Sequence, residues 1–278
     1  MLISELNSTH ASYDADTWGD YDALYEGGAK FRRRVARFLK QNPLEPAQVY
    51  SDRCSVAHYR SYLGPVVDYF AAFLFTSQIS IRAQVGSDTV EPDEFYARFK
   101  ESCDGKRADL VDFLRGRFTR ALIDGAAFWI VEKPRETTVR SKREWRERGL
   151  GDAVLKPVDR VDLLDWCVDE SGALLWCVIR SVDTFRPRPG AKQVVRTTWK
   201  IYDQTTITIY RHERTVDEPF DPSKEAALVE QYPHGFQEIP LVAIRIPVGL
   251  WVANRIESPQ REHFQLSNAN TWAIRKSC

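Results

Sequence analysis

Two acidic residues and a lysine around a short apolar segment are the first candidates for chemistry in this sequence. Asp124, Glu132 and Lys133 surround residues 126–131, whose apolar run predicts a buried strand. Paired carboxylates with a lysine are the side chains with which a metal-dependent nuclease holds its metal and cleaves DNA. Glu132 and Lys133 are adjacent, however, and adjacent strand residues point to opposite faces. The spacing therefore disfavours a nuclease, which remains the weakest of the alternatives.

Three aspartates at a spacing of three are the second candidate. Asp159, Asp162 and Asp165 could hold a metal as a cluster, or they could form the polar edge of a sheet. We favour the sheet edge, because the surrounding residues alternate as strands do.

The five cysteines lack metal spacing. Only Cys167 and Cys177 are close in sequence, where they flank a predicted turn at residues 169–172 and are expected to be cross-strand neighbours. We expect a soluble intracellular protein, whose thiols stay reduced, so free thiols are favoured over a disulfide.

Motifs for nucleotide, metal or acyl chemistry do not occur. The sequence has no G-x-x-x-x-G-K-[ST], G-x-G-x-x-G, H-E-x-x-H, C-x-x-C or G-x-S-x-G pattern. No apolar run approaches the roughly 20 residues of a membrane helix. We therefore predict no catalytic residue, no cofactor, no metal and no membrane partner.

A basic segment at residues 30–40 could contact phosphate groups. Its arginines make weak phosphate contacts the functional interpretation, and the alternative is a solvated helix with a narrow apolar stripe. The candidate contacts are Arg32, Arg33, Arg34 and Arg37. The 39 basic and 39 acidic residues cancel, which favours the solvated helix and disfavours a dedicated nucleic-acid binder.

Large aromatic residues are abundant, with eight Trp and eleven Tyr. Most are expected in cores. Trp145 and Trp251 lie in charged or loop contexts and are the better candidates for a subunit interface.

The elements that position these residues predict an α+β fold. We expect a flexible segment at residues 1–20, a helical part at 21–124, a mostly antiparallel β-rich part at 126–246 and a helix from 258 to 278. The N-terminal helices are expected to pack on the β-rich part.

Glycine and proline mark the expected boundaries. Gly27 and Gly28 interrupt a helix at 21–39, Gly64 and Pro65 kink or split a helix at 52–76, and Gly125 ends a helix with a positive φ. Ser258 and Pro259 resemble an N-cap followed by a first helical residue.

Strands and shorter elements complete the prediction. Hairpins are expected at 161–179 and 194–210, strands at 79–83, 226–232 and 241–246, a helix at 92–103 and an exposed charged segment at 137–152.

Taken in order, these segments resemble the portal proteins of tailed bacteriophages. The resemblance covers most of residues 20–275 and rests on order and spacing. The matching segments are YEGGAKFRRRVARFLKQNPLEPAQVYSDRCSVAHYRSYLGPVVDYFAAFLF, RALIDGAAFWIVEKP, LLDWCVDESGALLWCVIRS, IPLVAIRIP and the helix from Ser258. Portal proteins continue from that helix into a clip, a second stem helix, a tunnel loop and a crown, so this sequence corresponds to their N-terminal wing and stem entry.

The resemblance implies a structural role without catalysis. A portal is a ring, typically of twelve subunits, at one capsid vertex, through which DNA enters and leaves and to which the tail attaches. The implied partners are further copies of the chain, the major capsid protein, the terminase, a head-tail adaptor and non-specific double-stranded DNA. The implied location is the virion, and the host cytoplasm during assembly. The alternative is another neck or head-completion interaction protein.

Overall fold

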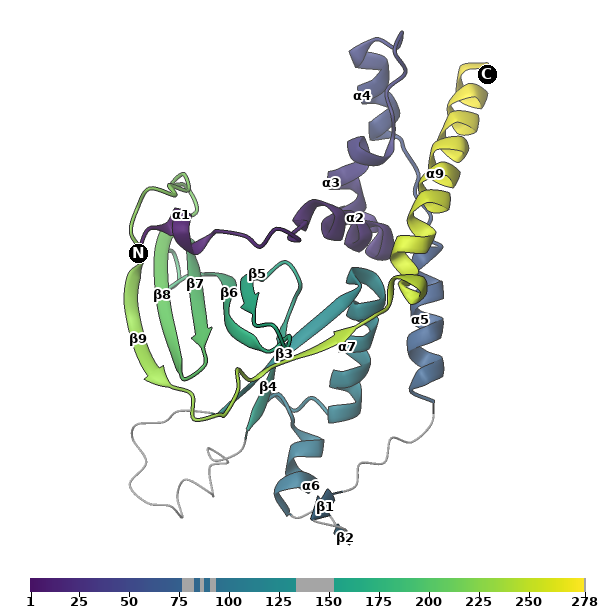
Figure 1. Ribbon diagram of the computed structural model, residues 1–278. Coiled ribbons are helices and arrows are strands. Elements are labelled where there is room, and N and C mark those ends of the chain that lie inside the picture. Colours follow the sequence, from purple (N-terminus) through teal and green to yellow (C-terminus); the bar gives the residue numbers. More distant parts are fainter. Residues whose placement is uncertain (77–82, 86–87, 91–93, 134–152, 278) are drawn as a thin grey trace. The chain divides into compact units, whose positions relative to one another are not determined.

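The chain folds as an α+β protein that ends in a long helix (Figure 1). The computed structural model describes residues 1–76, 83–85, 88–90, 94–133 and 153–277. Contacts divide the chain into two compact units. The β unit comprises residues 1–14, 128–132 and 156–242, and the helical unit comprises 15–127, 133–155 and 243–278. The expected α+β class and C-terminal helix are confirmed.

The helical unit is built around one apolar core. Its buried members include Leu24, Phe38, Leu63, Ile123 and Phe264. These residues come from sequence-distant helices, so packing joins both ends of the chain. The helices are α2 (Ala15–Glu26), α3 (Gly28–Phe38), α4 (Ala47–Ser55), α5 (Leu63–Leu74), α6 (Glu94–Glu101), α7 (Leu110–Asp124) and α9 (Val252–Ser277).

Glycines end two helices where the sequence predicts it. Gly27, with φ of 65°, separates α2 from α3, and α3 begins at Gly28, whose φ is 53°. Gly125 follows α7 with φ 80° and ψ −16°, and its N–H donates to the Ala121 carbonyl at 2.8 Å. At the other end of α7, the Asp109 side chain accepts from the Val111 N–H at 2.7 Å. The helix-to-strand joint is confirmed.

The predicted helix at 52–76 is split, although not at Gly64 and Pro65. Residues 56–62 form a non-helical linker between α4 and α5, and both residues lie in the first turn of α5. A proline is tolerated there because the first N–H groups of a helix have no intrahelical acceptor.

The predicted start of the last helix is wrong. α9 begins at Val252, six residues before Ser258, and Pro259 lies inside it. Ala253 is fully buried, and Ile256 packs against the helical core. Burial of this first turn outweighs the cost of an interior proline, which is about 3 kcal/mol.

The β unit contains a five-stranded antiparallel sheet of order β5–β6–β7–β8–β9. Cys167 pairs with Trp176 where β5 meets β6, and Tyr202 pairs with Ile207 where β7 meets β8, which confirms the two predicted hairpins. The strands are β5 (Leu163–Val168), β6 (Leu174–Phe185), β7 (Val194–Asp203), β8 (Thr206–Thr215) and β9 (Ala227–Pro233).

Smaller sheets complete the strands. β3 (Ala126–Glu132) lies between β10 (Leu241–Arg245) and β4 (Val154–Val158), and β1 (Ala83–Val85) pairs with β2 (Asp88–Val90). A 3₁₀ turn, η1 (Val248–Leu250), precedes α9. The predicted segment 137–152 and all but the last residue of the predicted strand 79–83 lie outside the described residues.

The first residues differ from the expected flexible segment. Helix α1 (Ile3–Leu6) buries Ile3 and Leu6 in the core of the β unit, together with Leu164 and Trp199. The Ile3 N–H donates to the Lys224 carbonyl at 2.9 Å. Two apolar side chains at helical spacing thus fix a segment that is otherwise polar.

Among the described residues, no helix has both the length and the hydropathy needed to cross a membrane.

Candidate functional site

The apolar residues of helix α5 divide into a buried stripe and an exposed group. Leu63 and Val67 are buried in the helical core, and Ala71 is also buried. Tyr69, Phe70, Phe73 and Leu74 lie in the C-terminal half of the helix and are 64%, 48%, 67% and 54% exposed. We call these four residues the α5 aromatic face.

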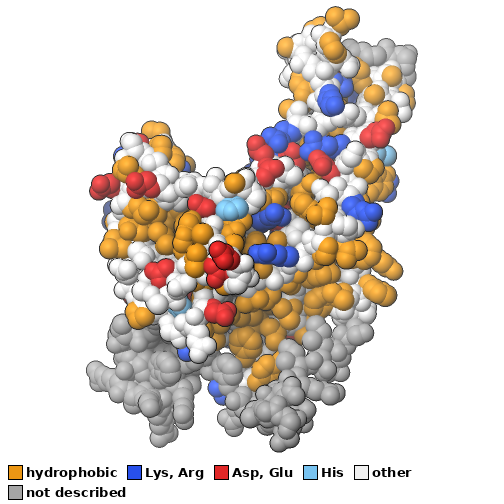
Figure 2. All heavy atoms as spheres, in the orientation of Figure 1, with side chains coloured by type: hydrophobic (Ala, Val, Ile, Leu, Met, Phe, Trp, Pro, Cys, Tyr) orange, Lys and Arg blue, Asp and Glu red, His pale blue; other side chains and the backbone are white. Residues whose placement is uncertain are grey.

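The rings of this face form a surface cluster. The Tyr69 ring centroid lies 5.8 Å from that of Phe70 and 6.1 Å from that of Phe73. Figure 2 shows hydrophobic side chains gathered over the position that α5 has in Figure 1. Contiguous exposed apolar surface of this kind marks interaction sites.

A buried carboxylate joins three helices of the same unit. Asp20 of α2 is 2% exposed and accepts hydrogen bonds from Arg34 Nη1 at 2.7 Å, Arg37 Nε at 2.8 Å and Arg261 Nη2 at 3.0 Å. Gly19 provides the space, because a Cβ atom there would lie 2.3 Å from Arg34 Nη2. The Asp20 cluster therefore fixes α3 and α9 against α2.

The four arginines predicted to contact phosphate differ in their partners. Arg34 and Arg37 are bound by Asp20 and lie 3.9 and 3.5 Å from the exposed Asp16. Arg33 Nε donates to the Ala29 carbonyl of its own helix at 3.3 Å. Only Arg32 remains without a carboxylate or carbonyl partner within the described part of the chain.

Two buried amides of α9 hold the linker 56–62. Gln260 accepts from the Tyr62 N–H at 2.8 Å and donates to the Arg60 carbonyl at 3.0 Å. Asn268 accepts from the His58 N–H at 3.0 Å and donates to the His58 carbonyl at 3.2 Å. The amides replace the helical hydrogen bonds that the linker lacks, so it has one defined path along α9.

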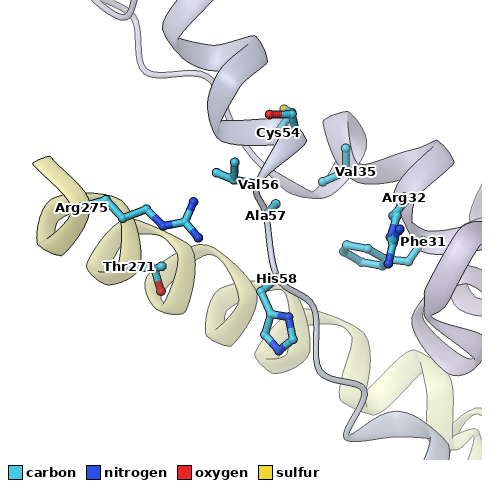
Figure 3. Close-up of a pocket in the computed structure, with 10 residues that line it drawn as sticks. Phe31, Arg32, Val35, Cys54, Val56, Ala57, His58, Thr271 and Arg275 are labelled. Atoms are coloured by element: carbon cyan, nitrogen blue, oxygen red, sulfur yellow. The ribbon is translucent and has the colours of Figure 1, made fainter.

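A groove of about 840 Å³ lies between α3, this linker and α9 (Figure 3). Arg32 enters it from α3 and Arg275 from α9, and His58 also lines it. Its apolar lining comes from Phe31, Val35, Val56 and Ala57, and the lining is completed by Cys54, Ser55 and Thr271.

The groove carries uncompensated positive charge. None of its described lining residues is Asp or Glu. Like Arg32, Arg275 has no carboxylate partner among the described residues. A wall of two free guanidinium groups over apolar side chains can bind an anion attached to an apolar group. We call it the two-arginine groove.

The predicted interface tryptophans have different outcomes. Trp145 lies outside the described residues. Trp251 is half-buried in the helical unit, where its Nε1 donates to the Ile123 carbonyl at 2.8 Å and its ring lies edge-on to Tyr21 at 5.4 Å. Trp251 thus makes contacts within its own unit.

The acidic residues of the nuclease alternative have separate partners. Asp124 of the helical unit binds Arg120 Nη2 at 2.6 Å. Glu132 of the β unit binds Lys200 Nζ at 2.6 Å, the Tyr202 hydroxyl at 2.8 Å and Lys156. Each carboxylate is neutralised by its own cations, and no described contact joins the two.

The environment of Glu132 favours its charged form. Burial alone would raise the pKa of this carboxyl group, but Lys200 and Lys156 outweigh burial and lower the pKa to about 2. The pKa of Tyr202 is raised, first by burial and then by the charge of Glu132. This group is an internal polar anchor of the β unit.

The three spaced aspartates precede and begin β5. Burial and the neighbouring carboxylate of Asp159 raise the pKa of Asp162 to about 6, whereas Arg180 lowers it. Within the described ranges, no group of three or more His, Cys, Asp or Glu side chains has metal-binding geometry.

Cys167 and Cys177 are free thiols on neighbouring strands. Cys167 pairs with Trp176 and Cys177 pairs with Trp166, so the two thiols point to opposite faces of the hairpin. The two cysteines lie on paired strands, but they are not the direct cross-strand neighbours that the sequence predicts, and the register explains the absence of a bond between them.

No protein-family model matches the chain, and no curated protein matches it in sequence.

Proposed function

We propose that this chain is a subunit of a portal-type ring of a tailed bacteriophage. In this role, copies of the chain stand side by side at a capsid vertex and form the wall of a DNA channel. The major capsid protein, terminase, head-tail adaptor and non-specific double-stranded DNA are its proposed partners. The chain itself is proposed to be structural and not an enzyme.

The α5 aromatic face is the observation that carries this proposal. Four large apolar side chains are exposed in the C-terminal half of a helix whose N-terminal half contributes Leu63 and Val67 to the core. Aromatic residues are enriched at the centres of protein interfaces and charged residues are depleted there. We assign this face to a neighbouring copy of the chain.

The order of the elements adds support. The segments that resemble portal proteins form helices, then an antiparallel sheet, then a long C-terminal helix. A ring requires head-to-tail contacts between two different surfaces of each subunit. Such a subunit needs rigid surfaces more than a reactive pocket.

The test is the size and shape of the purified protein. We expect annular particles of about a dozen copies by negative-stain microscopy. Phe73→Ser should reduce the assembled fraction at least tenfold, because a polar side chain replaces a ring at the proposed contact. Leu44→Ser is the matched control, since Leu44 is 97% exposed and lies outside the α5 aromatic face.

Two outcomes would contradict the proposal. A protein that stays monomeric at every concentration would favour another neck or head-completion protein. DNA cleavage with Mg²⁺ or Mn²⁺ that Asp124→Ala abolishes would favour the nuclease alternative.

A further inference from the structure

We infer that the two-arginine groove binds an acidic, aromatic loop of a second copy of this chain. The loop is residues 216–221, the first part of the connection from β8 to β9 (residues 216–226), and has the sequence Val-Asp-Glu-Pro-Phe-Asp. This inference rests on the proposed self-assembly and adds a second contact to it, apart from the α5 aromatic face.

The loop presents an aromatic ring beside negative charge. Phe220 is 47% exposed and Val216 is 48% exposed. Glu218 and Asp221 flank Phe220 and have no cation within 4 Å among the described side chains, whereas Asp217 is bound by Lys192 at 3.0 Å. One apolar anchor with two available carboxylates is the complement of the groove.

Internal hydrogen bonds give the loop a defined shape. The Glu218 carbonyl accepts from Arg214 Nη1 at 2.7 Å, and the Glu218 carboxylate accepts from the Thr215 N–H at 3.1 Å. Asp221 accepts from the Ser223 N–H at 2.9 Å. A loop that is ordered before binding loses less conformational entropy when it binds.

The groove matches this loop in both charge and chemistry. Arg32 and Arg275 line two of its sides and face no acidic lining residue among those described. Phe31, Val35 and Val56 form an apolar wall beside them that suits an inserted ring. The groove of one copy would pair with the loop of the next copy. Such a contact between two different surfaces is the type that closes a ring.

Nucleic acid fits the groove less well. Phosphate backbones are bound by extended sets of cations, and affinity grows with the number of contacts. On α3 and α9, Asp20 and Asp16 already neutralise Arg34 and Arg37, and Asp20 with Glu257 neutralises Arg261. The groove lining itself holds two arginines over apolar side chains, which favours a short acidic peptide segment.

Charge reversal tests the pairing in the full chain. Variant A carries Arg32→Glu and Arg275→Glu, and variant B carries Glu218→Arg and Asp221→Arg. Each alone should assemble at least tenfold less than wild type, because like charges then face each other. An equimolar mixture should assemble again, since each groove then meets a loop of opposite charge on the other variant.

The mixture also separates contacts between copies from contacts within one chain. Restoration on mixing requires that groove and loop come from different molecules. If both variants assemble like wild type, or if the mixture stays unassembled while both variants remain folded by circular dichroism, the pairing is wrong. Wild-type assembly in that case would leave the proposed function standing.

A peptide titration tests the groove even if the protein does not assemble. A synthetic peptide of residues 214–223 should bind wild type, and variant A should bind it at least tenfold more weakly. The same peptide with Phe220→Ser should also lose at least tenfold in affinity. Absence of binding to wild type, or binding of duplex DNA that variant A alone abolishes, would overturn the inference.

Discussion

Single charged residues in this protein mostly act on its internal structure. Asp20 is buried against three arginines, so its removal takes away their shared buried counter-charge and leaves them only Asp16 and Glu257. We expect Asp20→Asn to lower the free energy of unfolding by about 3 kcal/mol, measured by urea denaturation. Asp16→Asn is the control. Asp16 is 73% exposed beside the same Arg34 and Arg37, so the expected loss is below about 1 kcal/mol. Equal losses would contradict the buried role of Asp20.

Glu132 makes stability depend on pH. Its pKa falls from the ordinary 4.5 to about 2 on folding, because Lys200 and Lys156 outweigh the effect of burial. A carboxyl group whose pKa is lower in the folded protein stabilises the fold at pH values above its pKa in the unfolded chain. This stabilisation is lost as the pH falls from about 5 towards 2. Glu132→Gln should therefore be less stable than wild type by about 3 kcal/mol at pH 7, with a difference that shrinks below pH 4.

The matched control for this profile is Glu213→Gln. Glu213 forms a half-exposed pair with Arg196 in the five-stranded sheet of the same unit, so we expect a loss below about 1 kcal/mol. Denaturant melts at several pH values give both profiles. A Glu132→Gln deficit that stays constant from pH 7 to pH 3 would exclude the assigned ionisation.

Sequence patterns identified few of these residue roles. The basic segment 30–40 is visible in the sequence, but Asp20 lies on another helix and Arg261 lies more than 200 residues further along. Spacing rules cover neighbours on one element, whereas this cluster depends on how three helices pack. The same holds for Gln260 and Asn268, which resemble ordinary polar surface residues in the sequence.

At the scale of elements, the residue types at the ends of helices determine most of their boundaries. Gly125 gives the sharpest prediction, because its φ of 80° is strained for any side chain. Gly125→Val should cost about 1–3 kcal/mol, since a β-branched residue resists this conformation. Gly125→Ala should cost about 1 kcal/mol.

Gly116 supplies the control on the same helix. A Cβ there would meet nothing within 4 Å, so Gly116→Ala should stabilise α7 by up to about 1 kcal/mol. Thermal melts of the two Ala variants should therefore shift in opposite directions. Shifts of the same sign would mean that Gly125 does not end the helix.

The element that sequence reasoning placed wrongly shows where local rules stop. Ser258 and Pro259 have the residue types of a helix start, yet α9 begins at Val252. Tertiary burial of Ala253 and Ile256 extends the helix backwards through the proline. The sequence also shows that most residues of 63–74 are apolar, but it does not reveal that Tyr69, Phe70, Phe73 and Leu74 stay exposed within the chain.

At the scale of the whole molecule, the two units do not follow the linear division into helical and β-rich parts. The first 14 residues belong to the β unit, and residues 243–278 return to the helical unit. The sequence feature that could have indicated the place of the first 14 residues is a group of apolar residues in a polar segment, namely Leu2, Ile3 and Leu6. The chain therefore passes between units several times, which residue patterns within single elements cannot predict.

Assembly through the α5 aromatic face should link the stability of the protein to its concentration. A contact made only by folded chains shifts unfolding by mass action, so the melting temperature of wild type should rise with protein concentration. A tenfold change in concentration corresponds to at most about 1.4 kcal/mol per mole of contact, or a few degrees for a chain of this size. Phe73→Ser should melt at a temperature that does not depend on concentration, whereas Leu44→Ser should behave like wild type. A concentration-dependent melt in Phe73→Ser equal to that of wild type would place the assembly contact elsewhere on the molecule.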